Sequence, residues 1–495
     1  METKPSFWSK LKNFFRPIDL TQGSCWQVIL KFAVPILICN LLNMLYSFSD
    51  AAICGQTLSA DEVAGVNDTS SIVFIFMQFA FGCTSGFSVI LSNKIGAHDE
   101  QGTRRSFAAQ IWLVCAITVF LTVLSLLILP LMLAWVNLTP TNPEVYKAAY
   151  EYCFVIFIGM FAQFLYNLLI SVLRAIGDSF TPLMFLFIST VLNIVLDVAF
   201  IEAFHWGVAG AAVATVLTQF LCAVACFVYI GKRYNGILPR GEDFKVTGEE
   251  IWQHVKQGVP LGLQFSILSI GLIVMMSETV KFDLMPDGIM VAGNPAQNGV
   301  GAAHKLSNLV GAPLAALGVA MVSFNAQNIG AGRDDRVRKG TLQAVLMGLI
   351  ASVLTVGVGM LFTIGGFYQY IFLSADKITE RSLYFGNTYL YVTYVFVPLL
   401  AMVYVLRNSV QGTGRSIWTL IGGIGELIAR VLVCMFLPAL FNGGPTNAQA
   451  NTLSYMALCM GDPAAWLLSV AVLLYPFFKY IVRQKKDDSA LDTQL

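Results

Sequence analysis

Residues 188–200 read ISTVLNIVLDVAF, a stretch apolar enough to lie in a membrane although it carries Asn193 and Asp197. The two polar residues are four positions apart, so on a helix they lie above one another on one face. A carboxylate inside the hydrocarbon of a bilayer costs roughly 2.5–3.5 kcal/mol on insertion scales. We therefore expect Asp197 to face protein or water and to bind a cation.

The composition of the whole chain supports a membrane location. Of 495 residues, 56% are hydrophobic and 12% are charged, whereas soluble domains have about 25% charged residues. The net charge of +1 gives no reason to expect a nucleic-acid partner. The ten cysteines lie almost all in apolar runs, so we interpret them as small buried residues, and we expect no cofactor.

Apolar runs long enough to span a membrane, which takes about 20 residues, number about twelve. This predicts an all-α polytopic protein with a first half at 28–233 and a second half at 251–483. A linker at 234–250 joins the halves, and a basic, aromatic segment at 1–27 and a tail at 484–495 flank them. The predicted spans are 28–56, 63–95, 106–136, 146–173, 180–203, 207–231, 252–280, 298–328, 340–372, 383–409, 415–440 and 452–482.

The basic residues predict the orientation. With the N-terminus inside, only four of the 30 Lys and Arg residues fall in outer loops, namely Lys147, Lys281, Lys377 and Arg381. Because inside loops carry the excess of positive charge, we expect both termini in the cytoplasm and the protein in the inner or plasma membrane.

Three short matches between the halves indicate an internal repeat. KFAVP at 31–35 corresponds to KQGVP at 256–260, IGA at 95–97 to IGA at 329–331, and Gly177 to Gly414. Their order and nearly constant offset predict two pseudo-symmetric six-helix bundles. Such bundles place a substrate site between them near the middle of the membrane and work by alternating access.

The sequence has no nucleotide-binding motif, so we expect an ion gradient to be the energy source. The candidate ion ligands are Asp50, Asn193, Asp197 and Thr215, and Pro35 on the first helix is a candidate hinge. At about 1.5 Å per residue, Asp50, Asp197 and Thr215 lie at matching depth. Their oxygens suit a hard cation such as Na⁺ at Asp197, and a protonated carboxyl would instead join a hydrogen-bond network. For Asn193 and Thr215, hydrogen bonding between helices is the simpler alternative.

Taken in order, several motifs resemble the MATE (multidrug and toxic compound extrusion) transporter family over nearly the whole chain. The matching pieces are DAAICG at 50–55, LRAIG at 173–177, NIVLD at 193–197, GVAGAAVAT at 207–215, and QNIGAG at 327–332 with Arg336.

The resemblance implies a V-shaped pair of six-helix bundles that exports drug-like, often cationic compounds in exchange for H⁺ or Na⁺. It implies a cation site in the N-terminal bundle, as in bacterial and archaeal members, formed by Asp50, Asn193, Asp197 and Thr215 together with Asn167. It also implies bending of the first helix at Pro35. Asn167 fits less well, because its position in the sequence places it deeper than the others.

In the second half, the charges Glu278, Lys305, Glu426 and Arg430 lie within or near predicted spans. Glu278 and Lys305 are expected near the outer face as a pair. Glu426 and Arg430 are four apart, so we interpret them as an internal ion pair, with a functional role left open.

The predicted cavity wall is aromatic and rich in methionine, which suits flat cations through cation–π contact and adaptable packing. Packing in the core or against lipid is the alternative for each of these residues. Gln264 is a candidate polar contact from the second half. The other wall residues are Met44, Tyr46, Phe48, Phe74, Phe76 and Met77.

Together these patterns favour a monomeric antiporter for small molecules, which contacts the bilayer and is not an enzyme. A flippase for lipid-linked saccharides is the alternative within the same bundle pair, but it would favour a cationic central cavity. An intramembrane transferase would require clustered histidines, and the four histidines here are scattered.

Overall fold

The computed structural model describes residues 17–136, 138 and 142–483. Within these residues the chain is helical, with a single isolated β-bridge between Leu284 and Met290 and no strand. Eleven of the described helices are long and apolar enough to cross a membrane, and a bent pair gives a twelfth span. Most of the predicted N-terminal segment and the predicted tail lie outside the described residues.

The first six spans follow the predicted order. They are α2 (Cys25–Thr57), α3 (Ala60–Gly96), α4 (Glu100–Trp135), the pair α5 (Pro143–Ile158) and α6 (Met160–Ala175), α7 (Phe180–Val198) with the π-helical η1 (Ala199–Ala203), and α8 (Gly207–Arg233). The fourth span, predicted as one helix, is bent by 48° between α5 and α6. Gly159 lies at this bend, where a side chain would collide with Val216 of α8.

The second six spans repeat this plan. They are α9 (Gly248–Val280), α10 (Pro295–Gly330), α11 (Asp334–Thr363), α13 (Glu380–Gly412), α14 (Ser416–Asn442), and α15 (Thr452–Cys459) followed by α16 (Gly461–Phe477). The predicted span 340–372 is wrong at its end, because α11 stops at Thr363. Gly365 and Gly366 follow with φ of 84° and 71°, and a separate short helix, α12 (Phe367–Phe372), begins there.

Several helices begin a few residues before the predicted apolar runs, because polar caps start them. Ser59 accepts a hydrogen bond from the backbone of Glu62, whose side chain bonds back to the N–H of Ser59. Thr247 and Glu250 form the same reciprocal arrangement at the start of α9. These caps pair N–H groups that lack partners within their own helix.

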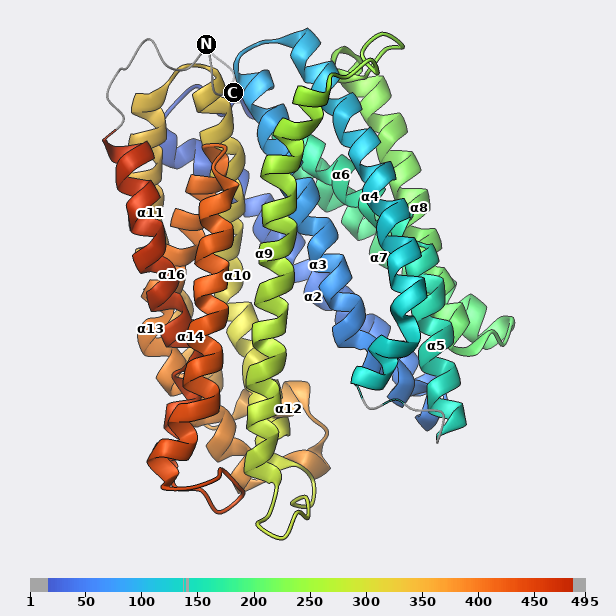
Figure 1. The fold of residues 1–495 in the computed structure, drawn as a ribbon, viewed down its shortest axis with the longest axis vertical. Helices are drawn as coiled ribbons and strands as arrows, with labels where there is room; N and C mark the ends of the chain where they lie inside the picture. Colours follow the sequence, from blue (N-terminus) through green and yellow to red (C-terminus); the bar gives the residue numbers. More distant parts are fainter. Residues whose placement is uncertain (1–16, 137, 139–141, 484–495) are drawn as a thin grey trace, which may run out of the picture.

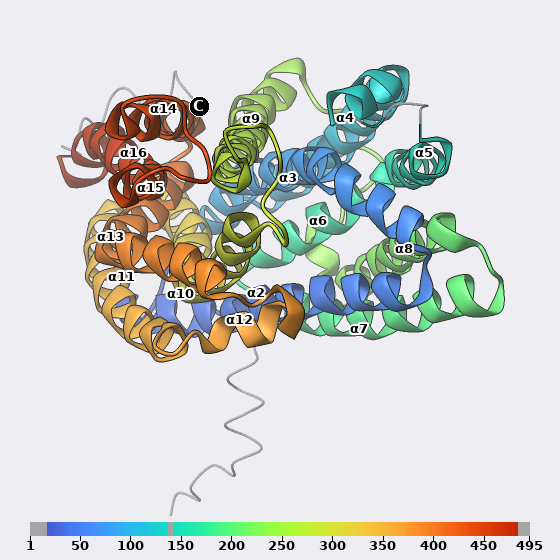
Figure 2. The ribbon, with the colours of Figure 1, turned by 90° about the horizontal axis from the view of Figure 1, so that it is seen from below.

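The two bundles form a V (Figure 1), with the described chain ends at the top of the view. We call that the terminal end and the opposite one the far end. α3 and α9 lie together near the terminal end and their ribbons diverge towards the far end. Viewed from the far end, α2 and α9 lie between the two groups of helices (Figure 2).

Two glycines mark the pseudo-symmetry at the terminal end. A side chain on Gly96 would collide with the carbonyl oxygen of Gln327, and one on Gly330 would collide with that of Asn93. Each glycine thus meets the carbonyl three residues before the other, as expected for α3 and α10 related by a two-fold axis. The repeated IGA motif therefore forms a close backbone contact between the bundles.

We expect Gly96→Ala and Gly330→Ala each to lower the stability of the protein by about 1–3 kcal/mol, because overpacking forces a backbone shift. The measurement is the midpoint of thermal unfolding in detergent. Gly357→Ala is the matched control, because a side chain built on Gly357 of α11 meets nothing within 4 Å. If the Gly96 and Gly330 variants unfold at the temperature of the control, the close contact is not a constraint.

Candidate functional site

Asp50, Asp197 and Thr215 come together inside the N-terminal bundle from α2, α7 and α8. Asp197 is 0% exposed and Asp50 is half-buried. Apolar contacts hold the three helices on both sides of the acids. Cys39 of α2 packs with Leu183 and Leu186 of α7, and Cys54 packs with Ile201 of η1 and Ala211 of α8.

Tyr46 completes this group, one helical turn before Asp50 on α2. Its side chain lies next to Asp50, Asp197 and Thr215. The sequence predicted Tyr46 as part of the cavity wall, whereas the structure places it among the acids. A phenol can both donate and accept a hydrogen bond, so Tyr46 can serve either charge state of its neighbours.

The two carboxyl groups lie close enough for direct contact. Nevertheless, neither oxygen of Asp197 has a hydrogen-bond donor among the described residues. Two ionised carboxylates are both acceptors, so a hydrogen bond between them forms only when one is protonated. A buried carboxylate without a donor is costly, and a proton or a small cation would remove that cost.

Asn193 and Asn167 lie near this group but differ in their surroundings. Asn193 is buried one turn before Asp197, and its amide nitrogen has no partner among the described residues. Asn167 of α6 lines an adjoining cavity of about 160 Å³ that also includes Tyr46. Asn167 and Tyr46 thus share one cavity, and the greater depth of Asn167 stays a prediction.

The sequence reasoning missed other polar residues of this cavity. Asn43, Gln163 and Gln219 line it, together with Ser189 and Arg174. The available signal was the spacing of Gln163 and Asn167, four apart in an apolar run, which places both on one helix face. The polar region of the N-terminal bundle therefore extends beyond the acids towards the terminal end.

The predicted cavity wall is only partly exposed. Phe74 and Phe48 are 48% and 36% exposed, and Met44 is intermediate. Phe76 instead lies against Phe157 with the two rings tilted and their centroids 5.0 Å apart, and Met77 packs on the core of the first bundle. Gln264 is fully buried against Gly423 of α14, so it does not line an open cavity in this structure.

The predicted pair of Glu278 and Lys305 is wrong. Glu278 pairs with Lys281, one turn later on the same stretch of chain, with 2.7 Å between Oε1 and Nζ. The Lys305 ammonium lies over the rings of Phe48 and Phe372, and no carboxylate of the described residues pairs with it.

The predicted pair of Glu426 and Arg430 is also wrong, because each residue has a partner on another helix. Glu426 pairs with Arg407 of α13. Arg430 donates two hydrogen bonds, of 3.0 and 2.7 Å, to Oδ1 of Asp462 on α16. The other oxygen of Asp462 accepts a 2.6 Å hydrogen bond from Tyr389, which is also in contact with His304.

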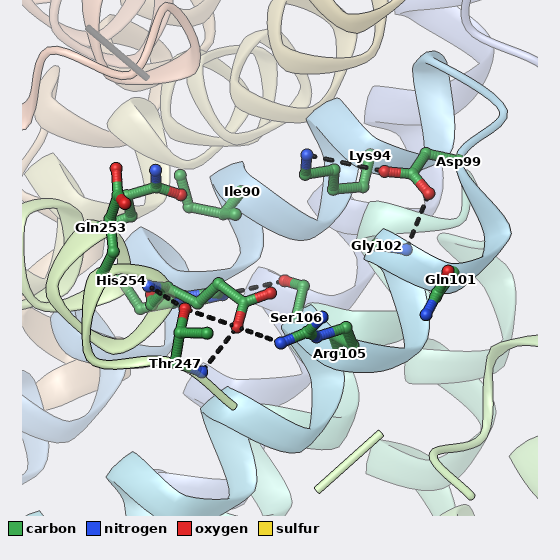
Figure 3. A pocket seen from close by; sticks show the side chains of 12 residues that line it. Ile90, Lys94, Asp99, Gln101, Gly102, Arg105, Ser106, Thr247, Gln253 and His254 are labelled. Carbon is green, nitrogen blue, oxygen red and sulfur yellow. Dashed lines mark hydrogen bonds and ion pairs between the residues drawn. The ribbon is translucent and has the colours of Figure 1, made fainter. Parts of the chain in front are cut away.

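A larger hollow, of about 450 Å³, lies at the terminal end between α3, α4 and α9 (Figure 3). Four of its charged side chains form two ion pairs, with Arg105 2.8 Å from Glu250 and Lys94 3.5 Å from Asp99. His254 is held there between Ser106 and the carbonyl of Glu250. This hollow lies where α3 and α4 of the first bundle meet α9 of the second, distant from Asp197. We do not regard it as the transport site.

The linker before α9 is bound to α4 at the same end of the molecule. Asp243 accepts hydrogen bonds from the backbone N–H of Arg240 and from the Arg104 guanidinium. These two donors hold the pKa of Asp243 below its usual value. The linker carboxylate therefore remains ionised near neutral pH and keeps its contact with α4.

The oxygen-rich group around Asp197 suits a proton or a hard monovalent cation. The described residues contain no group of three or more His, Cys, Asp or Glu side chains that could hold a metal ion. A site with two carboxylates, an amide and two hydroxyls is of the kind that small hard cations accept.

Comparisons with known proteins agree with this architecture. A family model described as MatE matches residues 35–199 and 286–436. The chain is 29% identical to the "Probable multidrug resistance protein YpnP" of Bacillus subtilis, covering 81% of this chain and 86% of that protein. It is 26% identical to the "Probable multidrug resistance protein NorM" of Thermotoga maritima, covering 79% and 80%.

The fold is shared with solved structures. A structure described as the "Outward-facing conformation of a multidrug resistance MATE family transporter of the MOP superfamily" superposes with a TM-score of 0.78. The match covers 92–93% of this chain in this and similar structures, at 19% sequence identity. At that identity the likeness concerns the fold.

Proposed function

Since this chain belongs to the MatE family, we propose that it exports drug-like, often cationic compounds in exchange for H⁺ or Na⁺. As a member of that family it is a multi-pass membrane transporter and not an enzyme. The multidrug resistance proteins among its relatives support the substrate class. The observation that carries the coupling is the pair of the half-buried Asp50 and the buried Asp197, in which neither Asp197 oxygen has a donor among the described residues.

In this proposal the acids of α2 and α7 take up the ion from the far end, which we place outside the cell. A proton would allow a hydrogen bond between the two carboxyl groups. Na⁺ would instead attract both carboxylates electrostatically and so draw them closer. Either event favours closer packing of α2 on α7. Because α2 runs unbroken through Pro35, a bend there would transmit the change to the contact with α10.

Export then requires that binding of the ion weakens binding of the substrate, and the reverse. If the ion weakens substrate binding by a given factor, the substrate must weaken ion binding by the same factor. Binding of the ion in the far-end state therefore releases substrate there, and loss of the ion at the terminal end restores affinity. We also propose that both termini lie inside the cell and that a single chain carries out transport as a monomer.

The domain boundaries belong to the same proposal. The first bundle is taken as 28–233 and the second as 251–483, separated by the linker. In support, α8 ends at Arg233 and α9 begins at Gly248. Each bundle also has a core of its own, one formed around Phe164 and Phe157 and the other around Tyr455 and Tyr389.

The experiment is substrate counter-transport by the purified full chain in liposomes. Ethidium uptake or release is followed while a pH gradient and a Na⁺ gradient are imposed separately. We expect one gradient to drive ethidium transport against its own concentration difference. If neither gradient changes the steady-state level of ethidium, the antiport proposal is wrong.

A further inference from the structure

We propose that Phe48 and Phe372 form a binding site for an organic cation at the far end, and that Lys305 occupies this site as a tethered competitor. The inference rests on the proposed function, because it concerns how a cationic substrate would be held. It adds a ligand site that lies outside the ion-binding group.

The site is built from both bundles. Phe48 lies on α2, Phe372 ends the short helix α12, and Lys305 lies on α10. The centroids of the two rings are 5.7 Å apart, and the Lys305 ammonium is 5.7 Å from one and 5.8 Å from the other. Figure 2 shows α12 beside α2 when the molecule is viewed from the far end.

The contacts of Lys305 identify the ligand class. No carboxylate of the described residues pairs with Lys305, so the aromatic faces are the partners that the structure gives its charge. An ammonium within about 6 Å of a ring centroid is attracted by the negative face of the ring. The two rings therefore already hold a cation, and a monovalent organic cation of the same charge would compete for them.

The site is accessible and can release its occupant. Phe48 is 36% exposed and Lys305 is exposed, whereas Phe372 packs on the core of the second bundle. A lysine side chain is long and flexible, so it can move into water when another cation takes its place.

The position of Phe48 links this site to the acids. Phe48 lies two residues from both Tyr46 and Asp50, which places it on roughly the opposite face of α2. Tyr46 and Asp50 face the interior of the first bundle, while Phe48 faces the second bundle. A shift of α2 at the acids would therefore also move one ring of the cation site.

The test is equilibrium binding of radiolabelled tetraphenylphosphonium to the full chain in nanodiscs, without any gradient. We expect Lys305→Gln to lower the Kd about threefold to tenfold, because it removes the competitor. Lys305→Arg keeps a cation over the rings and should leave the Kd near that of the wild type. Lys377→Gln, which removes an exposed positive charge without a described ring contact, should also leave it unchanged.

A second variant separates the rings from the charge. In the Lys305→Gln background, Phe372→Leu keeps an apolar side chain but removes the aromatic face, so the gain in affinity should disappear. If the double variant keeps the whole gain, the effect of Lys305 is general charge repulsion and the proposed site is wrong. If Lys305→Gln weakens binding or leaves it unchanged, Lys305 is not a competitor, and the proposal is equally wrong.

Failure of this inference is distinct from failure of the proposed function. Binding and gradient-driven transport of the probe that do not depend on Phe48, Phe372 or Lys305 would refute only the new site. Absence of probe binding in every variant would refute the site, and absence of gradient-driven transport of any cation would refute the proposed function.

Discussion

Replacement of Asp197 with Asn is expected to abolish gradient-driven export while leaving the protein folded. Asn has nearly the same shape as Asp but cannot take up or release a proton, and it lacks the charge that attracts Na⁺. Since Asp197 is fully buried and lies beside Asp50, the variant would remain close to the ion-filled state. The coupling between linked sites is typically worth about 5–150-fold in affinity. We expect the variant to lose this coupling, so that gradient-driven export falls to the background rate.

The measurement is the rate of ethidium export driven by the effective gradient in liposomes, with exchange in the absence of a gradient as a second readout. Asp50→Asn is expected to give a loss of the same order, because it removes the other carboxyl of the pair. Glu202→Gln is the matched control, since it removes one negative charge from the exposed part of η1, five residues after Asp197. Wild-type rates in both aspartate variants would refute the ion site.

Hydropathy predicted most of the fold because the energetic requirement is local. A helix in a bilayer must satisfy its own backbone hydrogen bonds, so each apolar run of sufficient length becomes a span. The exceptions are breaks inside apolar sequence. The bend at Gly159 and the end of α11 before Gly365 depend on backbone geometry and on neighbours such as Val216, which hydropathy does not register.

The acid group was predicted for a similar reason. Asp50 and Asp197 stand out because an acid in an apolar run is costly wherever its partner lies. Asn43, Gln163 and Gln219 carry no charge and cost less, so they gave a weaker signal, although they line the adjoining cavity. The position of Tyr46 beside the acids was not predicted, since only the packing of α2 on α7 decides which face of α2 meets the acids.

The ion pairs of the second half could not be predicted from spacing. Residues four apart on a helix can meet, but their pairing adds only about 0.2–0.5 kcal/mol and is easily replaced by a better partner. Arg430 instead meets Asp462 on α16, and Glu426 meets Arg407 on α13. Asp462 on α16, which is the partner of Arg430 in this network, was not singled out from the sequence.

The network around Asp462 leads to the second large effect, a loss of stability in Arg430→Met. Both Arg430 and Asp462 are 4% exposed, so loss of the guanidinium would leave a buried carboxylate whose remaining described donor is Tyr389. Removal of one partner of a buried ion pair costs about 3–5 kcal/mol, whereas replacement of both partners is often nearly neutral. We therefore expect a large drop in the midpoint of thermal unfolding in detergent.

The matched control restores neutrality without restoring the ion pair. In Arg430→Met with Asp462→Asn, the amide oxygen can still accept the hydrogen bond of Tyr389, and no charge is left unpaired. The double variant should regain most of the lost stability, because the penalty comes from the isolated charge and not from the missing contact. A single variant as stable as the wild type would mean that Asp462 is protonated or hydrated in the folded protein, and a double variant as unstable as the single one would assign the loss to packing around Arg430.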